Sequence, residues 1–307
     1  MKKVPIIILF FIYSCNLFAQ YYQQFSQYLL NGQAINPAYA GSREVLSTTL
    51  LYRDQWVGFA GAPRTMTFSA HTPLTSLSSA IGLQIFSDKI GVSKHNGIFI
   101  NYAYRIRFKK NHRTLAFGMG AGVNTFRSDF SNVAINDLGD KAFEYQYLRS
   151  TRPNFSIGAY YYSKRFFAGA SIPSLLRYGY DVFGTAPDSL RTSPQNSYYT
   201  VGYVFGINKD IQFSPSILLK TNYPQNGQID LNLKLSIYDA LGMALSIRFG
   251  DALVWIIDYQ IIPNQLRIGY AHDFSTSMLN KYAHGTNEFM LRYEFAYKSN
   301  VVSTKLF

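Results

Sequence analysis

The sequence predicts an all-β protein, a transmembrane antiparallel β-barrel of about 14 strands, and three observations predict it. Long stretches alternate between apolar and polar or small residues with a period of two, which is the period of a strand. After the first 19 residues, no run reaches the ~18 consecutive apolar residues that a membrane helix needs. The connections between strands alternate between short and long, as they do in bacterial outer-membrane barrels.

The chain starts with a stretch that predicts a cleaved signal peptide at residues 1–19. Two lysines stand at the start, an apolar run covers residues 4–13, and a small-residue site precedes Gln20. The only cysteine, Cys15, could instead belong to a lipoprotein signal, although the residues before it match such a signal poorly. Cleavage before Gln20 would leave a mature chain without cysteine, which excludes disulfides and thiolate chemistry.

Residues 20–44 form a separate N-terminal segment that contains the sequence NPAYAG, Asn36 to Gly41. No charged residue occurs between Gln20 and Ser42. Pro37 fixes its own φ and pushes Asn36 out of the helical region, while Gly41 tolerates a positive φ. We therefore expect a compact turn that leads into the first strand. Upstream of it, Tyr21, Phe25, Tyr28 and Leu29 have helical spacing, and Gln23, Gln24, Gln27 and Asn31 supply amides.

Residues 45–307 are predicted to form the barrel. Between Gln228 and Asp239, for example, Leu231, Leu233 and Leu235 alternate with polar residues, so one face suits lipid and the other a polar lumen. The predicted strands are 45–54, 63–71, 79–88, 96–108, 113–126, 153–163, 165–174, 197–207, 210–221, 228–238, 241–249, 252–262, 265–274 and 286–298. A soluble sandwich or propeller is the alternative, but no repeat of 40 to 50 residues marks propeller blades.

The width of such a barrel bears on the uncharged segment. Fourteen strands enclose a lumen wider than that of an eight-stranded barrel, whose own side chains can fill it. A loose periplasmic tail is expected to carry charge, whereas residues 20–42 carry none. We expect this segment to pack in or against the periplasmic mouth of the barrel. A disordered leader is the alternative.

The chain has a positive net charge, but the distribution of its lysines and arginines does not indicate a nucleic-acid partner. The formal net charge is +12, which becomes +10 without the two lysines of the leader. A basic balance can indicate nucleic acid or anionic lipid. The lysines and arginines here are scattered among aromatic residues, and no basic helix or recognition motif accompanies them, which argues against nucleic acid.

Several short motifs resemble one known family in their order along the chain. They are Asn36-Pro37-Ala38-Tyr39-Ala40-Gly41, then Arg53-Asp54-Gln55-Trp56, then Ala62-Pro63-Arg64-Thr65, followed by weaker matches such as Asp88-Lys89-Ile90-Gly91 and Ile268-Gly269-Tyr270. This order resembles the PorP/SprF family of type IX secretion system membrane proteins over nearly the whole mature chain. The family motif residues carried over are Asn36, Pro37, Tyr39, Gly41, Arg53, Gln55, Trp56 and Pro63.

The resemblance implies a location and a role. It implies a multi-pass protein in the outer membrane of a Gram-negative, Bacteroidota-like bacterium, in contact with outer-membrane lipid. It also implies assistance in secretion or surface attachment of proteins with a type IX C-terminal signal, including gliding adhesins in relatives. The implied partners are the type IX translocon, periplasmic ring components and the secreted substrate, and no enzyme activity or cofactor is implied.

The residues themselves leave two further questions open. The five histidines have no metal-ligand spacing and no G-x-S-x-G motif is present, so catalytic, cofactor and metal sites are not expected. The cluster Arg53 to Trp56 is either a strand-end ion pair beside an interfacial tryptophan or a loop that contacts a partner. The competing function is an outer-membrane channel for small anionic or hydrophobic solutes, because five inward-facing bases, Arg105, Arg107, Lys234, Arg248 and Arg267, face few acids, chiefly Asp230.

Overall fold

A computed structural model describes residues 23–74, 78–108, 112–131, 147–176, 195–223 and 227–295. The predicted signal peptide, Cys15 and the chain beyond Phe295 lie outside these residues, as do most of the links over 127–152 and 175–196. In the described part of the chain, no helix is both long and apolar enough to cross a membrane.

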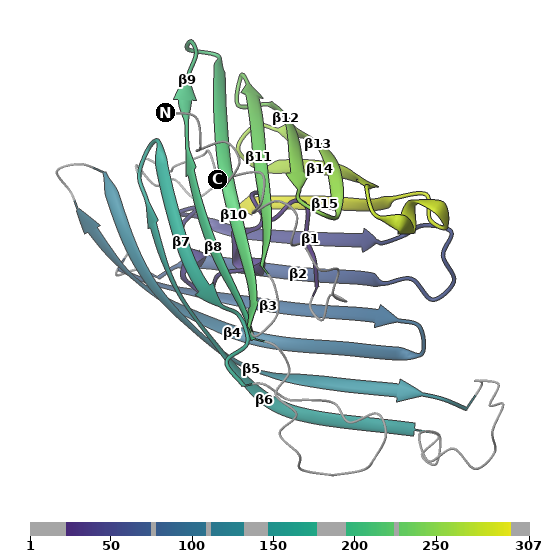
Figure 1. Ribbon diagram of the computed structural model, residues 1–307. Coiled ribbons are helices and arrows are strands. Elements are labelled where there is room, and N and C mark those ends of the chain that lie inside the picture. Colours follow the sequence, from purple (N-terminus) through teal and green to yellow (C-terminus); the bar gives the residue numbers. More distant parts are fainter. Residues whose placement is uncertain are drawn as a thin grey trace, which may run out of the picture.

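The described residues form one antiparallel sheet that curls into a barrel (Figure 1). Its strands are β1 (Leu46–Asp54), β2 (Arg64–Pro73), β3 (Ser79–Ile90), β4 (Ser93–Phe108), β5 (Arg113–Asp129), β6 (Tyr147–Tyr162), β7 (Phe166–Ile172), β8 (Gln195–Tyr203), β9 (Phe205–Gly206), β10 (Ile211–Tyr223), β11 (Gln228–Ile237), β12 (Leu241–Arg248), β13 (Ala252–Ile262), β14 (Leu266–Ser275) and β15 (Thr286–Phe295).

The sheet closes on itself, because every barrel strand is hydrogen-bonded to a neighbour on both sides. Each strand pairs with its neighbour in sequence, β15 pairs with β1, and β10 pairs with both β8 and β11. The short β9 continues β8 in the same register against β10, so the two are one barrel strand. The interruption between them lies beside Pro215, which is opposite Tyr203 and has no N–H for the ladder. The described residues thus form a closed barrel of fourteen strands, as predicted.

Strand bounds differ from the prediction at two places that shape the surface. The link between the fifth and sixth strands was expected over residues 127–152, whereas β5 continues to Asp129 and β6 starts at Tyr147. The link between the third and fourth strands was expected over residues 89–95. Instead, β3 continues to Ile90 and β4 starts at Ser93, leaving a two-residue turn. Gly91 has a φ of 55° there, a value that a tight hairpin turn requires and that glycine adopts without strain.

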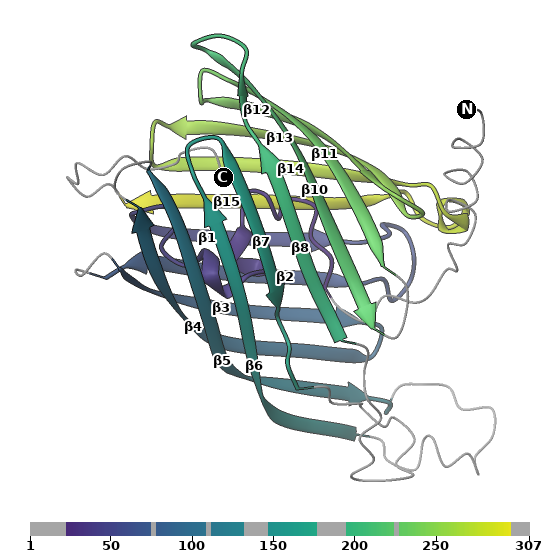
Figure 2. The same ribbon diagram turned by 60° about the vertical axis from the view of Figure 1, so that its left-hand side comes forward.

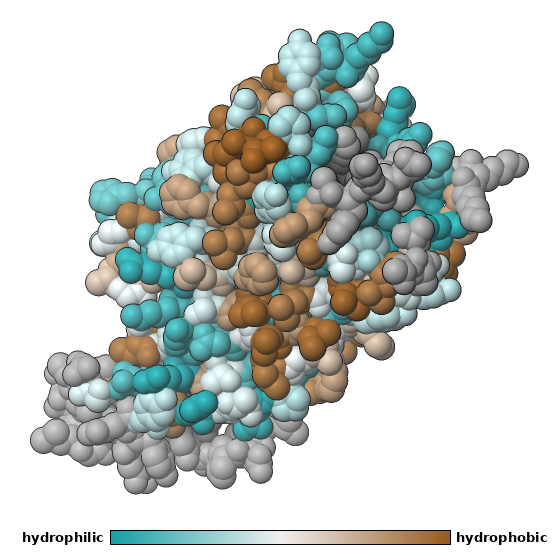
Figure 3. Space-filling view, turned by 180° about the vertical axis from the view of Figure 1, so that it is seen from behind, coloured by the Kyte–Doolittle hydropathy of each residue, from teal (hydrophilic) through white to brown (hydrophobic). Residues whose placement is uncertain are grey.

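The two faces of the barrel wall have opposite character. On β5, the outward Phe117 and Met119 are 51% and 61% exposed, whereas Ala116 on the opposite face is fully buried. On β11, Leu233 is 40% exposed, and Lys234 points inward to an ion pair with Asp258. Figure 3 shows the exposed apolar residues as a brown band across one face of the molecule. This outward band is the surface that a membrane-spanning barrel presents to lipid.

The substitution Leu233→Arg tests this assignment of faces. Leu233 lies in the middle of β11, so an arginine there would stand near the centre of the hydrocarbon core. We expect a loss of about 2–4 kcal/mol in the free energy of unfolding, measured by urea titration in lipid vesicles. The matched control is Ile207→Arg in the β9–β10 turn, where the cost should fall to about 0–1 kcal/mol. Equal losses for the two variants would mean that the register of β11 is wrong.

The two ends of the barrel are distinguished by their connections. One end, here called the turn end, carries the connections at 74–78, 109–112, 163–165, 207–210, 238–240 and 263–265. The other, here called the loop end, carries those at 55–63, 130–146, 173–194 and 276–285 as well as the short connections at 91–92, 224–227 and 249–251. In bacterial barrels the short turns lie in the periplasm and the longer loops lie outside.

Candidate functional site

The lumen of the barrel is occupied by the chain's own N-terminal segment. Residues 23–44, here called the plug, are almost all buried. Figure 2 shows the two short 3-10 helices of the plug, η1 (Gly32–Ala34) and η2 (Pro37–Tyr39), in purple among the strands. The spacing of Phe25, Tyr28 and Leu29 suits an α-helix, yet no described residue of the plug is α-helical. Packing inside the barrel is as predicted for this segment.

The plug reaches further than the periplasmic mouth. At the turn end, Arg43 pairs with Glu294 near the end of β15, with 2.7 Å between Nε and Oε1. At the loop end, the Gln24 side-chain amide donates to Asp251 Oδ2 over 3.1 Å, and Asp251 lies in the β12–β13 turn. Because its two ends contact opposite ends of the barrel, the plug extends along most of the lumen.

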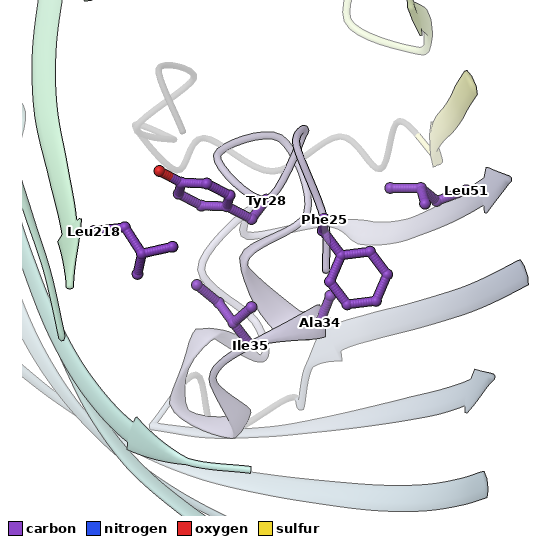
Figure 4. Packing of buried hydrophobic residues seen from close by; sticks show 6 residues of the cluster. All are labelled: Phe25, Tyr28, Ala34, Ile35, Leu51 and Leu218. Carbon is purple, nitrogen blue, oxygen red and sulfur yellow. The ribbon is translucent and has the colours of Figure 1, made fainter. Parts of the chain in front are cut away.

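Apolar contacts hold the middle of the plug. Figure 4 shows Phe25, Tyr28 and Ile35 of the plug between Leu51 of β1 and Leu218 of β10. Leu51 and Leu218 point inward and are at most 1% exposed. Inward leucines are unusual for a water-filled barrel, whose lumen is polar, and here they pack against the plug.

The NPAYAG turn lies inside the lumen. The Asn36 side-chain oxygen accepts from Ala38 N (2.9 Å), and its amide donates to Ala159 O of β6 (3.0 Å). Pro37 occupies the first position of η2, where its missing N–H costs no hydrogen bond. Tyr39 is 4% exposed and packs against the rings of Tyr160 and His71. The turn therefore joins the plug to the barrel wall.

Gly41 adopts the conformation that the sequence predicted. Its φ is 76°, and a Cβ there would overlap Ala80 of β3. Its N–H donates to His71 Nδ1 (3.1 Å), and its carbonyl accepts from Arg105 Nη1 (2.6 Å). Any other residue would face both backbone strain and a steric clash at this position.

The substitution Gly41→Val should destabilise the protein through both effects. The control variant Gly250→Val, in a loop-end turn, separates the two effects. Gly250 has nearly the same φ, 78°, but nothing lies within 4 Å of a Cβ there. The strain should be shared by the two valine variants at about 1–3 kcal/mol. The clash should cost Gly41→Val about 1–3 kcal/mol more. Unfolding midpoints in detergent measure both, and equal losses would show that the plug is not seated at Gly41.

Glycines on the inner wall make room for the plug. A Cβ at Gly118 of β5 would overlap the backbone nitrogen of Ala38, and one at Gly158 of β6 would overlap the Asn36 side chain. Gly82 of β3 and Gly269 of β14 face Gln33 and Gln27 in the same way. The inner wall is therefore shaped to fit the backbone and amides of this segment.

A buried cluster of charges ties the loop-end part of the plug to four strands. Arg53 of β1 donates to Asp273 Oδ2 (2.8 Å) and to Glu288 Oε2 (3.1 Å), and Arg248 also donates to Asp273 (3.0 Å). Arg53, Arg248 and Glu288 are at most 2% exposed. Ser26 of the plug donates its hydroxyl to Asp273 (2.8 Å) and its N–H to Glu288 (2.9 Å).

The inward bases are neutralised by acids, which corrects the expectation that few acids face them. Among the described residues, Arg105 and Arg107 pair with Glu44 of the plug, and Lys234 and Arg267 pair with Asp258. Arg248 pairs with Asp273, Asp230 and Asp251. The lumen therefore does not present the field of unpaired positive charge on which an anion channel would depend.

The motif Arg53 to Trp56 is divided between the two faces of the wall. Arg53 points inward, whereas the outward Asp54 forms an exposed ion pair with Arg64 (3.0 Å), so the ion pair at this strand end joins Asp54 to a residue outside the motif and not to Arg53. Gln55 is 8% exposed, and its N–H donates to Pro63 O (2.9 Å), which closes the base of the β1–β2 loop.

The β1–β2 loop surrounds a pocket of about 290 Å³ at the loop end. Trp56 lines it with a φ of 50°, and its N–H donates to Thr286 Oγ1 (3.1 Å). The loop is tied to the β14–β15 connection by Val57 and Gly285, and to the β3–β4 turn by Gly61 and Gly91. The pocket is thus built on an ordered part of the outer end.

Sequence reasoning missed the partners of Arg53. Ser26, Asp273 and Glu288 are separated from one another by up to 262 residues. The available signal was the position of Asp273 and Glu288 on the inward face of their predicted strands, where acids are expected only beside bases. No group of three or more potential metal ligands occurs among the residues that the structure describes.

The sequence matches one known protein family, and the fold is similar to solved outer-membrane proteins. The family described as type IX secretion system membrane protein PorP/SprF matches residues 17–293. No curated protein matches the sequence. Among solved structures, the chain is similar to the Acinetobacter baumannii outer membrane protein Omp33, at 11% identity and a TM-score of 0.46, over 82% of this chain and 100% of that one. It is also similar to the monoaromatic hydrocarbon channel CymD, at 11% identity and a TM-score of 0.49, over 88% and 94%.

Proposed function

Because the chain belongs to the PorP/SprF family of type IX secretion system membrane proteins, we propose that it assists secretion or surface attachment of proteins with a type IX C-terminal signal. The family and the barrel place it in the outer membrane, which it crosses with its strands. Gliding adhesins are one class of such substrates. The proposed role is not enzymatic, and its proposed partners are the type IX translocon and periplasmic ring components.

The occupied lumen is the observation that carries this proposal. Plug residues Gln27, Ala38 and Ala40 are fully buried, and two of the spaces between plug and wall measure about 30 and 50 Å³. A secreted polypeptide is much wider than such spaces. The protein therefore acts through its outer surfaces and ends, as an accessory to a translocon whose pore lies elsewhere. A passive channel is the competing function. The inward bases are paired with acids, which argues against a channel that selects anions.

Deletion of the gene separates the two functions. We expect one or a few proteins with type IX C-terminal signals to accumulate inside the cell, while uptake of small solutes changes little. Complementation with the unmutated gene should restore secretion. Normal secretion together with lost solute uptake would overturn the proposal and favour the channel.

A locked plug provides a sharper test. The Asn31 amide lies 3.4 Å from Ser69 Oγ, and the chain after Cys15 has no cysteine, so Asn31→Cys with Ser69→Cys gives a single possible cross-link. Complementation by the oxidised double variant should still restore secretion, because nothing passes through the lumen. Each single cysteine variant is a control. Secretion that stops on oxidation of the double variant alone would show that the plug must move.

A further inference from the structure

Five basic residues form a continuous row on the outer wall at the loop end. Arg64, Lys89, Lys94, Arg127 and Arg149, here called the basic strip, are direct cross-strand partners on five successive strands from β2 to β6. At a strand spacing of about 4.8 Å, the row is ~19 Å long. All five side chains are exposed and belong to the outward face of their strands.

Such a row is unfavourable by itself. Like charges directly opposite each other on neighbouring strands are destabilising, and this row contains four such pairs in succession. Arg64 has Asp54 as its partner. Within the described ranges, Lys89, Lys94, Arg127 and Arg149 form no ion pair within 4 Å, although Asp129 lies near Arg127 and the Arg127 guanidinium stacks on Tyr147 (4.8 Å).

The rows below the strip place it at a membrane boundary. Two residues toward the turn end, the outward partners on β3 to β6 are the polar Ser87, Asn96, Thr125 and Thr151. Two residues further, Ile85, Ile98 and Val123 are 40–45% exposed, and Phe68 on β2 is 36% exposed. On β3 to β5 the strip thus lies four residues, or ~13 Å along the strands, from the first exposed apolar residues, and on β2 the exposed Met66 is two residues from Arg64.

We infer that the basic strip binds the phosphate groups of lipopolysaccharide in the outer leaflet. A row of cations that is separated from the apolar band of a barrel wall by one row of polar residues lies at the level of the headgroups of the surrounding lipid. The loop end is the outer end, and phosphorylated lipid A is the anionic headgroup present there. A multiply charged phosphate lipid relieves the repulsion between the opposed bases, which Asp54 and Asp129 offset only at Arg64 and Arg127. This binding requires only the outer-membrane location and is independent of the role in secretion.

Native mass spectrometry of the purified full-length protein with added lipid A tests this site. The parent should retain bisphosphorylated lipid A, and the triple variant Lys89→Gln, Lys94→Gln, Arg127→Gln should retain it at least ~10-fold less. The matched control removes the same charge at the turn end with Lys164→Gln, Arg165→Gln and Lys209→Gln, and it should bind as the parent does. Heat-modifiable migration on a gel checks that each variant is folded.

A second experiment compares phosphorylated and dephosphorylated lipid A with the unmutated protein, so its result does not depend on whether a variant folds. The parent should bind it at least ~10-fold less than the phosphorylated form, and salt should weaken binding of the phosphorylated form. Equal retention of the two lipids, or equal retention by the strip variant and the parent, would overturn the inference. Binding of polyglutamate in place of lipid A would also overturn it, because the strip would then take an acidic polypeptide.

Discussion

Replacing Arg53 by methionine should lower the free energy of unfolding by about 3–5 kcal/mol, because it leaves the buried Glu288 without its cation. Arg53 is 1% exposed and donates to both Asp273 and Glu288. Arg248 still contacts Asp273, so Glu288 is the acid left without a described basic partner. The loss is measured by urea titration in lipid vesicles, with the folded fraction read from migration on a gel.

An exposed ion pair made by the next residue of β1, Asp54, is the control for Arg53→Met. Arg64 pairs with Asp54, but their side chains are 65% and 27% exposed, so Arg64→Met should cost no more than about 1 kcal/mol. The comparison removes the same charge in each case. Similar losses for the two variants would contradict the buried cluster at the loop end.

Replacing Gly118 by valine should displace the plug while leaving the barrel closed. A Cβ at Gly118 would overlap the backbone of Ala38, which cannot move without moving η2. Overpacking of this kind costs about 1–3 kcal/mol. The strands pair through their own backbones, so heat-modifiable migration should persist. Protease added from the turn end should then cut residues 23–42 in this variant and spare them in the parent.

Ala121→Val is the matched control for Gly118→Val. Ala121 lies three residues further along β5 with its side chain on the exposed outward face. A valine there adds similar volume to lipid-facing space and should leave the plug protected. Cleavage of the plug in the unmutated protein, or equal protection of both valine variants, would show that Gly118 does not seat η2.

The barrel could be predicted from the sequence because lipid imposes a simple pattern on each strand. Residues 114–123 of β5 and 229–233 of β11 alternate between the two faces, since one face meets hydrocarbon and the other does not. The errors at β3 and β4 arose because Lys89 and Lys94 are charged yet lie on strands, where they form part of the basic strip. Charge suggested a connection, although the ladder continues there.

The plug could be predicted only in part. The absence of charge in residues 20–42 and the geometry of Pro37 and Gly41 indicated a packed segment with a turn. Its extension to the loop end depends on contacts such as that of Ser26 with Asp273, whose partners are 247 residues apart. A pattern with a period of two assigns each acid to a face but does not say which base lies across the lumen from it.

Conductance in planar lipid bilayers tests the occupied lumen most directly. The purified parent should be almost silent, because residues 23–44 occupy the lumen from one end to the other. A variant that lacks residues 23–42 should conduct, since fourteen strands without the plug enclose a lumen nearly as wide as that of the 16-stranded porins. A steady conductance of the parent equal to that of the shortened variant would contradict the account.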